Sequence, residues 1–311
     1  MAPTGPDRFS ADTAALDPGA IARCLDLMGV EEADRPGCAR LLSRPAAAEV
    51  RLAMEHLERR LGSFTAKPVE DHGLSEETWT EAILRFAHLV VRWHGRLGIS
   101  PADSALILAD IGRQMAIHRR VHGNFGLETW AWLTLHLTGT MFQLGRLQYH
   151  LVPSEEHGGW ALDIHIPELT GEQAGLAPEA VDASLALARV FFADHFPDKP
   201  VTTATCSSWM LDPYLSRVLP HGNIAAFARR FEVGHCTDAP DDAVYFTFRQ
   251  RGLEGLERLP RKTSLQRAVL DRINDGGTWQ LGHGHLLLPE QGYGQRQARG
   301  QEQTPGREPG A

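Results

Sequence analysis

Two residues with complementary acid–base chemistry, Asp163 and His165, stand two positions apart in the sequence. Apolar and polar residues alternate over 160–166, a pattern typical of a β-strand, and residues two apart on a strand face the same side. A carboxylate beside an imidazole raises the basicity of the ring and can make it a proton acceptor near neutral pH. Two interpretations stay open: His165 takes a proton from a substrate with Asp163 as its partner, or it is a hydrogen-bonded structural histidine on the wetter face of a sheet.

Small polar residues end the next expected strand, 201–206, where Cys206 is followed by Ser207 and Ser208. Their side chains can form hydrogen bonds with a ligand at a strand end. Cys206 can act as a nucleophile only if a neighbouring base activates its thiol. A buried, inert thiol is the more common state of a cysteine, and we favour it here.

Histidine pairs suggest metal ligands at two places, His118 with His122 and His283 with His285. Neither pair has an evident third ligand, and no glutamate follows His118 as it does in the helical zinc motif. The sequence therefore predicts no metal site.

Two other groups have a structural and a functional interpretation. The basic residues Arg261, Lys262 and Arg267 stand at an expected helix start, where they either meet a phosphate or form a solvated face. Tryptophans at helical spacing favour helix packing over an aromatic ligand cage; they are Trp79, Trp93, Trp130 and Trp132.

The pattern of apolar residues in the first half of the chain predicts helices. Capping residues precede apolar stripes at Asp17, Ser75 and Ser100, and glycines such as Gly98 end them. The last helix is expected over 127–144 and, being apolar on several sides, is expected to be central and buried. We expect an all-α bundle of about six helices.

The pattern changes after Arg146 from helical to mostly alternating. Strands and helices that take turns predict a mixed sheet flanked by helices. Expected strands cover 148–152, 160–166, 201–206, 244–248 and 279–288; expected helices cover 178–192, 210–218 and 263–274; and 224–233 is either. We therefore expect two domains, 12–145 and 146–289, between disordered ends at 1–11 and 290–311.

Composition narrows the class of protein. The 311 residues carry a formal net charge of -8, which disfavours nucleic acid and anionic membrane surfaces as partners. The four cysteines form no CxxC pair, and neither a secretory signal nor a membrane span is evident, so we expect a cytoplasmic protein. The absence of a GxSxG or P-loop string disfavours an unrelated hydrolase.

Six local strings resemble a bacterial family of acyltransferase-domain proteins, in which a helical N-terminal domain precedes a C-terminal domain like that of the GNAT acyltransferases. The resemblance spans most of the chain between about 16 and 288 and is most specific in the second half. The strings are LGRLQY (144–149), LDIHIP (162–167), FFADHFP (191–197), CSSWMLDP (206–213), GNIAAF (222–227) and LPRKTSLQRA (259–268).

The resemblance implies acyl transfer from acyl-CoA, the co-substrate, to an amine or similar small-molecule acceptor. It places His165 beside the acyl thioester. It also places Cys206, Ser207 and Ser208 along the pantetheine arm between two splayed strands, and Tyr214 where it could reprotonate the CoA thiolate.

The expected phosphate loop departs from the family pattern. GNAT enzymes usually carry [QR]xxGx[GA] between a strand and a helix, where backbone amides hold the CoA pyrophosphate. Here the loop before Pro178 offers only Gly171, Ala174 and Gly175, and Ala177 cannot cap the helix with its side chain. A non-catalytic binding or regulatory module on a degenerate GNAT fold is therefore the alternative. The sequence defines neither acceptor, acyl chain length nor oligomeric state.

Overall fold

The computed structural model describes residues 13–171 and 175–288. The predicted disordered ends, 1–11 and 290–311, and the predicted loop residue Ala174 lie outside the described residues.

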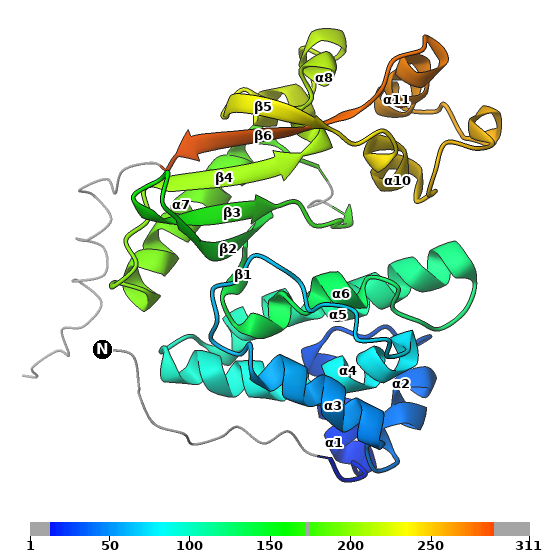
Figure 1. The fold of residues 1–311 in the computed structure, drawn as a ribbon, viewed down its shortest axis with the longest axis vertical. Helices are drawn as coiled ribbons and strands as arrows, with labels where there is room; N and C mark the ends of the chain where they lie inside the picture. Colours follow the sequence, from blue (N-terminus) through cyan, green and yellow to red (C-terminus); the bar gives the residue numbers. More distant parts are fainter. Residues whose placement is uncertain (1–12, 172–174, 289–311) are drawn as a thin grey trace, which may run out of the picture.

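Helices make up the described chain up to Thr138, and they pack together at one end of the molecule (Figure 1). Side-chain caps form where the sequence predicts them: Asp17 Oδ1 accepts from the N–H of Ala20, Ser75 Oγ from Thr78, and Ser100 Oγ from Asp103. The elements are α1 Pro18–Leu27, α2 Arg35–Leu42, α3 Ala48–Glu58, α4 Glu76–Arg96, α5 Pro101–His122, α6 Trp130–Leu133 and the 3-10 helix η1 His136–Thr138.

Apolar faces of these helices form one core. The predicted structural role of the tryptophans is confirmed for the pair Trp79 and Trp130, whose rings stack with centroids 4.6 Å apart. Within the same core, Arg85 and Glu81 form a buried ion pair with Nη2 and Oε1 2.9 Å apart.

The rest of the chain contains a six-stranded sheet in the order β1-β2-β3-β4-β6-β5. Strands β3 and β4 are parallel and every other neighbouring pair is antiparallel. The strands are β1 Met141–Leu144, β2 Leu147–Ser154, β3 Gly159–His165, β4 Thr203–Ser208, β5 Glu232–Asp238 and β6 Gln280–Leu287.

One face of this sheet is apolar and is covered by α7, which crosses behind it (Figure 1). Leu162 and Ile164 of β3 pack there with Val181 and Phe192 of α7. Alternation along β3 therefore turns Asp163 and His165 to the opposite face, as predicted. The flanking elements are α7 Pro178–His195, η3 Trp209–Leu211, α8 Pro213–Val218, α9 Asn223–Ala228, α10 Asp242–Phe248, η4 Leu256–Arg258 and α11 Ser264–Asn274.

The predicted helix over 127–144 is wrong. The chain forms α6 and η1, turns at Gly139 with φ 72°, and continues as β1. A second turn at Gly145, with φ 66°, makes β1 and β2 a hairpin, so LGRLQY contains a hairpin turn rather than a helix-to-strand junction. An apolar run that is buried on both sides has no periodicity to distinguish a strand from a helix, which explains the error.

The structure also decides two other predictions made for the second half of the chain. The predicted strand 244–248 is wrong, because it lies in α10, where Val244 is buried and Phe246 is half exposed. The segment 224–233, left open between helix and strand, contains most of α9 and the start of β5.

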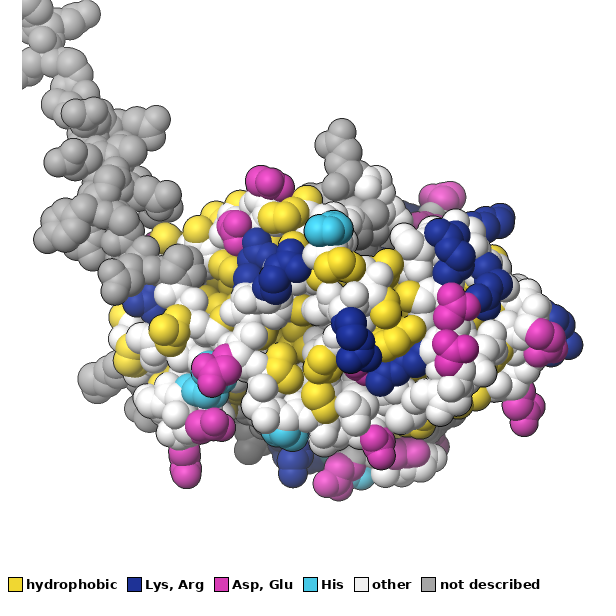
Figure 2. Space-filling model, turned by 90° about the horizontal axis from the view of Figure 1, so that it is seen from above, with side chains coloured by type: hydrophobic (Ala, Val, Ile, Leu, Met, Phe, Trp, Pro, Cys, Tyr) yellow, Lys and Arg dark blue, Asp and Glu magenta, His cyan; other side chains and the backbone are white. Residues whose placement is uncertain are grey.

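The helical part packs directly against the β1 edge of the sheet. His94 of α4 lies within hydrogen-bond distance of the Gly139 carbonyl, and its ring contacts Phe142 of β1. Seen from above, the end of the molecule beyond the sheet carries separate groups of basic and acidic side chains among uncharged ones (Figure 2). No helix in the described ranges is long and apolar enough to cross a membrane.

Candidate active site

The sheet opens between its two parallel strands. Strands β3 and β4 pair only at Leu162 with Ala204 and at Asp163 with Thr205. Beyond these pairs β3 and β4 no longer pair with each other: His165 pairs with Gln148 of β2, and Ser207 and Ser208 pair with β6. Such a splay offers unpaired backbone groups to a ligand that lies along it.

Asp163 and His165 meet on the face of β3 that is turned away from α7. The Asp163 Oδ2 and His165 Nε2 atoms are 3.4 Å apart, and Thr205 Oγ1 donates to Asp163 Oδ1 at 3.1 Å. Burial raises the pKa of Asp163 to about 6 and lowers the pKa of His165 to about 3. At neutral pH the His165 ring is therefore uncharged, but it is a weaker base than an ordinary histidine. The expectation that Asp163 raises the basicity of His165 is wrong, because the effect of burial dominates.

A buried polar layer lies behind His165, where the helical part meets the sheet. His136 Nε2 and Asp110 Oδ2 are 2.9 Å apart, and Arg113 forms an ion pair with the same carboxylate. These groups lower the pKa of Asp110 despite burial, and Gln148 contributes to that shift. The ring of Trp132 touches both histidines edge-on, with centroids 5.9 Å from His136 and 4.7 Å from His165.

Two ring atoms of this layer, His136 Nδ1 and His165 Nε2, are buried without a hydrogen bond among the described residues, although His165 Nε2 lies 3.4 Å from Asp163 Oδ2. Unsatisfied buried polar atoms are uncommon and often mark a place where a ligand or water binds. Sequence reasoning missed this layer. Its one local signal was Asp110, a charged residue among the buried Ile107 and Ile111 of α5.

The loop between β3 and α7 is held by a buried arginine. Arg146 donates from Nε to the Gly175 carbonyl at 2.7 Å and from Nη1 to the Pro167 carbonyl at 3.2 Å. Gly171 and Gly175 are exposed on this loop. Ala177 caps α7 without a side-chain hydrogen bond, as its type predicts.

The three small residues at the end of β4 have different surroundings. Cys206 lies in the core beneath the sheet, and burial raises the pKa of its thiol well above the ordinary value. A protonated thiol is a poor nucleophile, which supports the inert role favoured from sequence. Ser207 is exposed, with Oγ 2.8 Å from His283 Nδ1, whereas Ser208 Oγ accepts from the N–H of Met210.

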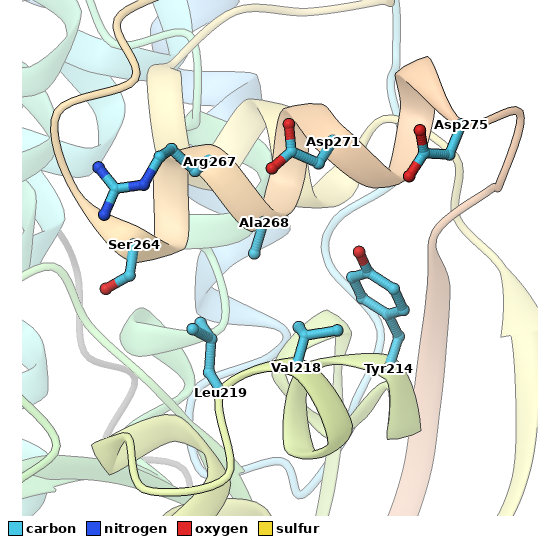
Figure 3. A pocket seen from close by; sticks show the side chains of 8 residues that line it. All are labelled: Tyr214, Val218, Leu219, Ser264, Arg267, Ala268, Asp271 and Asp275. Carbon is cyan, nitrogen blue, oxygen red and sulfur yellow. The ribbon is translucent and has the colours of Figure 1, made fainter.

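Tyr214 belongs to a different place, a cleft of about 450 Å³ between α8 and α11 (Figure 3). Its ring packs edge-on against Trp279 and lies 4.5 Å from the Arg272 guanidinium. The structure therefore does not bring Tyr214 into the contacts of His165 described above, and its role as proton donor stays a prediction. Arg267 also lines this cleft, and Arg261 beside it is paired with Asp271.

The histidine pairs are used in other contacts. The rings of His118 and His122 touch each other, and His283 lies between the hydroxyls of Ser207 and Thr237. Within the described ranges, no group of three or more His, Cys, Asp or Glu side chains is arranged to hold a metal ion.

Comparisons with known proteins match both parts of the chain. Residues 19–139 match the model of an N-acyltransferase N-terminal domain, and residues 141–286 match that of a GNAT-like C-terminal domain. The comparison with curated protein sequences found no match.

Solved structures resemble nearly the whole chain. A mutant acyltransferase in complex with octanoyl-CoA is 30% identical, with a TM-score of 0.81 over 92% of each chain. An acyltransferase in complex with decanoyl-CoA and teicoplanin is 29% identical, with a TM-score of 0.77 over 89% of this chain and 90% of the other. An acyltransferase in complex with CoA and 10C-teicoplanin is also 29% identical, with a TM-score of 0.77 over 92% of each chain.

Proposed function

Because the chain belongs to the bacterial acyltransferases that join an N-acyltransferase N-terminal domain to a GNAT-like C-terminal domain and use acyl-CoA, we propose that it acylates an amine with His165 as the proton acceptor. The observation that carries this proposal is the position of Asp163 and His165 at the splay between β3 and β4. An uncharged imidazole at this point is suited to take the proton that an attacking amine must lose.

The reaction follows from these positions. The amine nitrogen attacks the thioester carbonyl carbon, and His165 Nε2 takes the proton as the carbon–nitrogen bond forms. The carbon–sulfur bond then breaks, and the CoA thiolate leaves and takes up the proton that His165 holds, which returns the ring to its uncharged form. Asp163, whose Oδ2 is 3.4 Å from His165 Nε2, stabilises the positive charge that develops on the ring.

Acyl-CoA is expected to lie along the splay. The pantetheine arm would form hydrogen bonds with the unpaired backbone of β3 and β4, near Ser207 and Ser208. The pyrophosphate would lie over the loop before α7, where Gly171 and Gly175 are exposed and the first N–H groups of the helix lack a side-chain cap. The Arg146 hydrogen bonds that hold this loop support a preformed site.

The acyl chain is expected to be of medium length, since related proteins bind octanoyl-CoA and decanoyl-CoA. The acceptor is expected to be a small amine-bearing molecule, and teicoplanin, which a relative binds, is the first compound to test. The net charge of -8 and the four free cysteines support a cytoplasmic enzyme without a nucleic-acid partner.

Release of the CoA thiol tests the proposal directly. We expect thiol release from octanoyl-CoA or decanoyl-CoA to depend on the protein and on an added amine, with teicoplanin and simple primary amines as the first acceptors. His165→Ala should lower kcat by about 10²–10⁴-fold while leaving CoA binding intact, because it removes only the proton acceptor.

His72→Ala is the matched control, because His72 only stacks on His56 in the helical part. An unchanged rate in His165→Ala would contradict the role of His165. Binding of acyl-CoA without turnover for any amine would favour the alternative, a non-catalytic module on this fold.

A further inference from the structure

Glu168, in the loop that follows β3, is held by two arginines from distant parts of the chain. Its Oε1 accepts from Arg120 Nη2 at 2.6 Å, and its Oε2 accepts from Arg249 Nε at 2.9 Å and also from Arg249 Nη2. Arg120 stands in the last turn of α5, in the helical part, and Arg249 directly follows α10. Three separate segments therefore meet at this loop.

The backbone at Arg249 adopts an uncommon conformation to reach this position. Its φ of 57° is the one positive value at a non-glycine residue in the described ranges. Side chains disfavour this region, so a residue stays there only when its surroundings hold it. The Arg249 guanidinium lies 5.2 Å from the Tyr245 ring and 5.6 Å from the Phe246 ring, which fix its direction.

The cluster of Glu168, Arg120 and Arg249 contains more positive than negative charge. The loop reads ELTG over 168–171, so Glu168 stands where the [QR]xxGx[GA] pattern has glutamine or arginine. A carboxylate there would repel a phosphate, but two guanidinium groups leave the cluster with one positive charge. Each guanidinium has five N–H donors and uses only some of them on Glu168.

We propose that Arg120 and Arg249 bind the pyrophosphate of acyl-CoA and that Glu168 holds them in place until the phosphates arrive. The inference rests on the proposed placement of acyl-CoA along the splay and over this loop. Planar guanidinium groups match the oxygens of phosphate in paired hydrogen bonds, so they supply what the altered motif lacks. The helical part would thereby contribute directly to co-substrate binding.

Calorimetric titration of the full chain with three probes tests the proposal. The probes are CoA, dephospho-CoA, which lacks the 3′-phosphate, and S-octanoyl pantetheine, which lacks all phosphates. Arg120→Gln and Arg249→Gln should each lower the affinity for CoA and for dephospho-CoA by about tenfold, because each removes a charge-assisted phosphate contact. For the same reason, the affinity of each variant should depend less on salt concentration. Neither substitution should change the affinity for S-octanoyl pantetheine.

Arg119→Gln is the matched control, since Arg119 is the preceding residue on α5 but pairs with Glu31 and Asp34. It should leave all three affinities within about twofold, as expected for a charge away from the ligand. Glu168→Gln should bind CoA at least as tightly as the wild type, because it removes the competing charge while its amide oxygen can still accept a hydrogen bond that holds an arginine in place.

Each other outcome contradicts a defined part of the proposal. Wild-type affinity for CoA in both arginine variants would overturn it, as would an equal loss for S-octanoyl pantetheine. A loss seen with CoA but not with dephospho-CoA would overturn the assignment to the pyrophosphate. Weaker CoA binding in Glu168→Gln would show that Glu168 does not compete with phosphate. If the wild type bound none of the probes, the proposed placement of acyl-CoA itself would fail.

Arg249→Gln can disturb α10, so Arg120→Gln, on the exposed end of α5, keeps the test valid if that variant unfolds.

Discussion

Two clusters of buried charged side chains in this protein differ in how completely their hydrogen bonds are made. In the helical core, Arg85 bonds Glu81 and donates to the carbonyl oxygens of Ala14 and Arg44. At the junction with the sheet, Asp110 bonds His136, but the second nitrogen of that ring has no partner among the described residues. Burying charge is costly unless it is paired and hydrogen-bonded.

We propose that the difference separates a structural cluster from one that serves the active site. The Arg85 cluster connects α4 to the segments around Ala14 and Arg44, and its hydrogen bonds are already made within the protein. The Asp110 cluster reaches His165 through the ring of Trp132, and His136 Nδ1 in it has no hydrogen-bond partner among the described residues. We interpret its incomplete bonding as the consequence of a site that must accommodate substrate.

The largest effect on stability is expected from a substitution that breaks the ion pair between Arg85 and Glu81. Arg85→Met should lower the free energy of unfolding by about 3–5 kcal/mol, because it removes the buried partner of Glu81 and leaves only the more distant and partly exposed Arg44 as its counter-charge. Urea denaturation measures this, and kcat per folded molecule should not change. Recovery of stability in the double variant Glu81→Leu/Arg85→Met would confirm the cause; a loss below about 1 kcal/mol in the single variant would contradict it.

Asp163→Asn should raise the free energy of unfolding rather than lower it, and the size of this gain should depend on pH. The pKa of Asp163 is raised from 3.8 to about 6, so the folded chain binds the proton more tightly than the unfolded chain does. Stability is therefore lost as the pH rises from about 4 to 6, and the amide avoids that loss. Relative to wild type, the variant should gain about 1–3 kcal/mol between pH 4 and pH 7 in chemical denaturation. The same relative stability at both pH values would contradict the raised pKa.

Asp110→Asn tests whether the junction cluster serves catalysis. We expect kcat to fall by about tenfold while the KM for acyl-CoA stays unchanged, because the carboxylate orients His136 and stabilises positive charge near His165. Steady-state kinetics in the thiol-release assay measures both. Asp34→Asn removes another buried carboxylate in the helical part and should leave kcat unchanged. Equal losses in the two variants would assign Asp110 a structural role only.

The smallest effect is expected on the apolar face of the sheet. Cys206→Ala should change kcat by less than about twofold, because the buried thiol stays protonated and faces the core. Loss of turnover in a folded variant would instead favour an acyl-carrying thiol.

Local features of the sequence predicted much of the fold. The caps at Ser75 and Ser100 and the alternation around Asp163 depend on neighbours a few residues away, and the structure has them where expected. The hairpin at Gly145 was missed, because strand pairing depends on residues that the local pattern does not identify.

The sequence by itself determined that Asp163 and His165 share one face of a strand, because alternation is a local property of an extended chain. Only the tertiary structure decided that Asp110 and His136 stand behind that pair and that Arg120 and Arg249 meet Glu168. These contacts join segments far apart in the chain. They depend on how the helical part packs against the sheet, which no local pattern encodes.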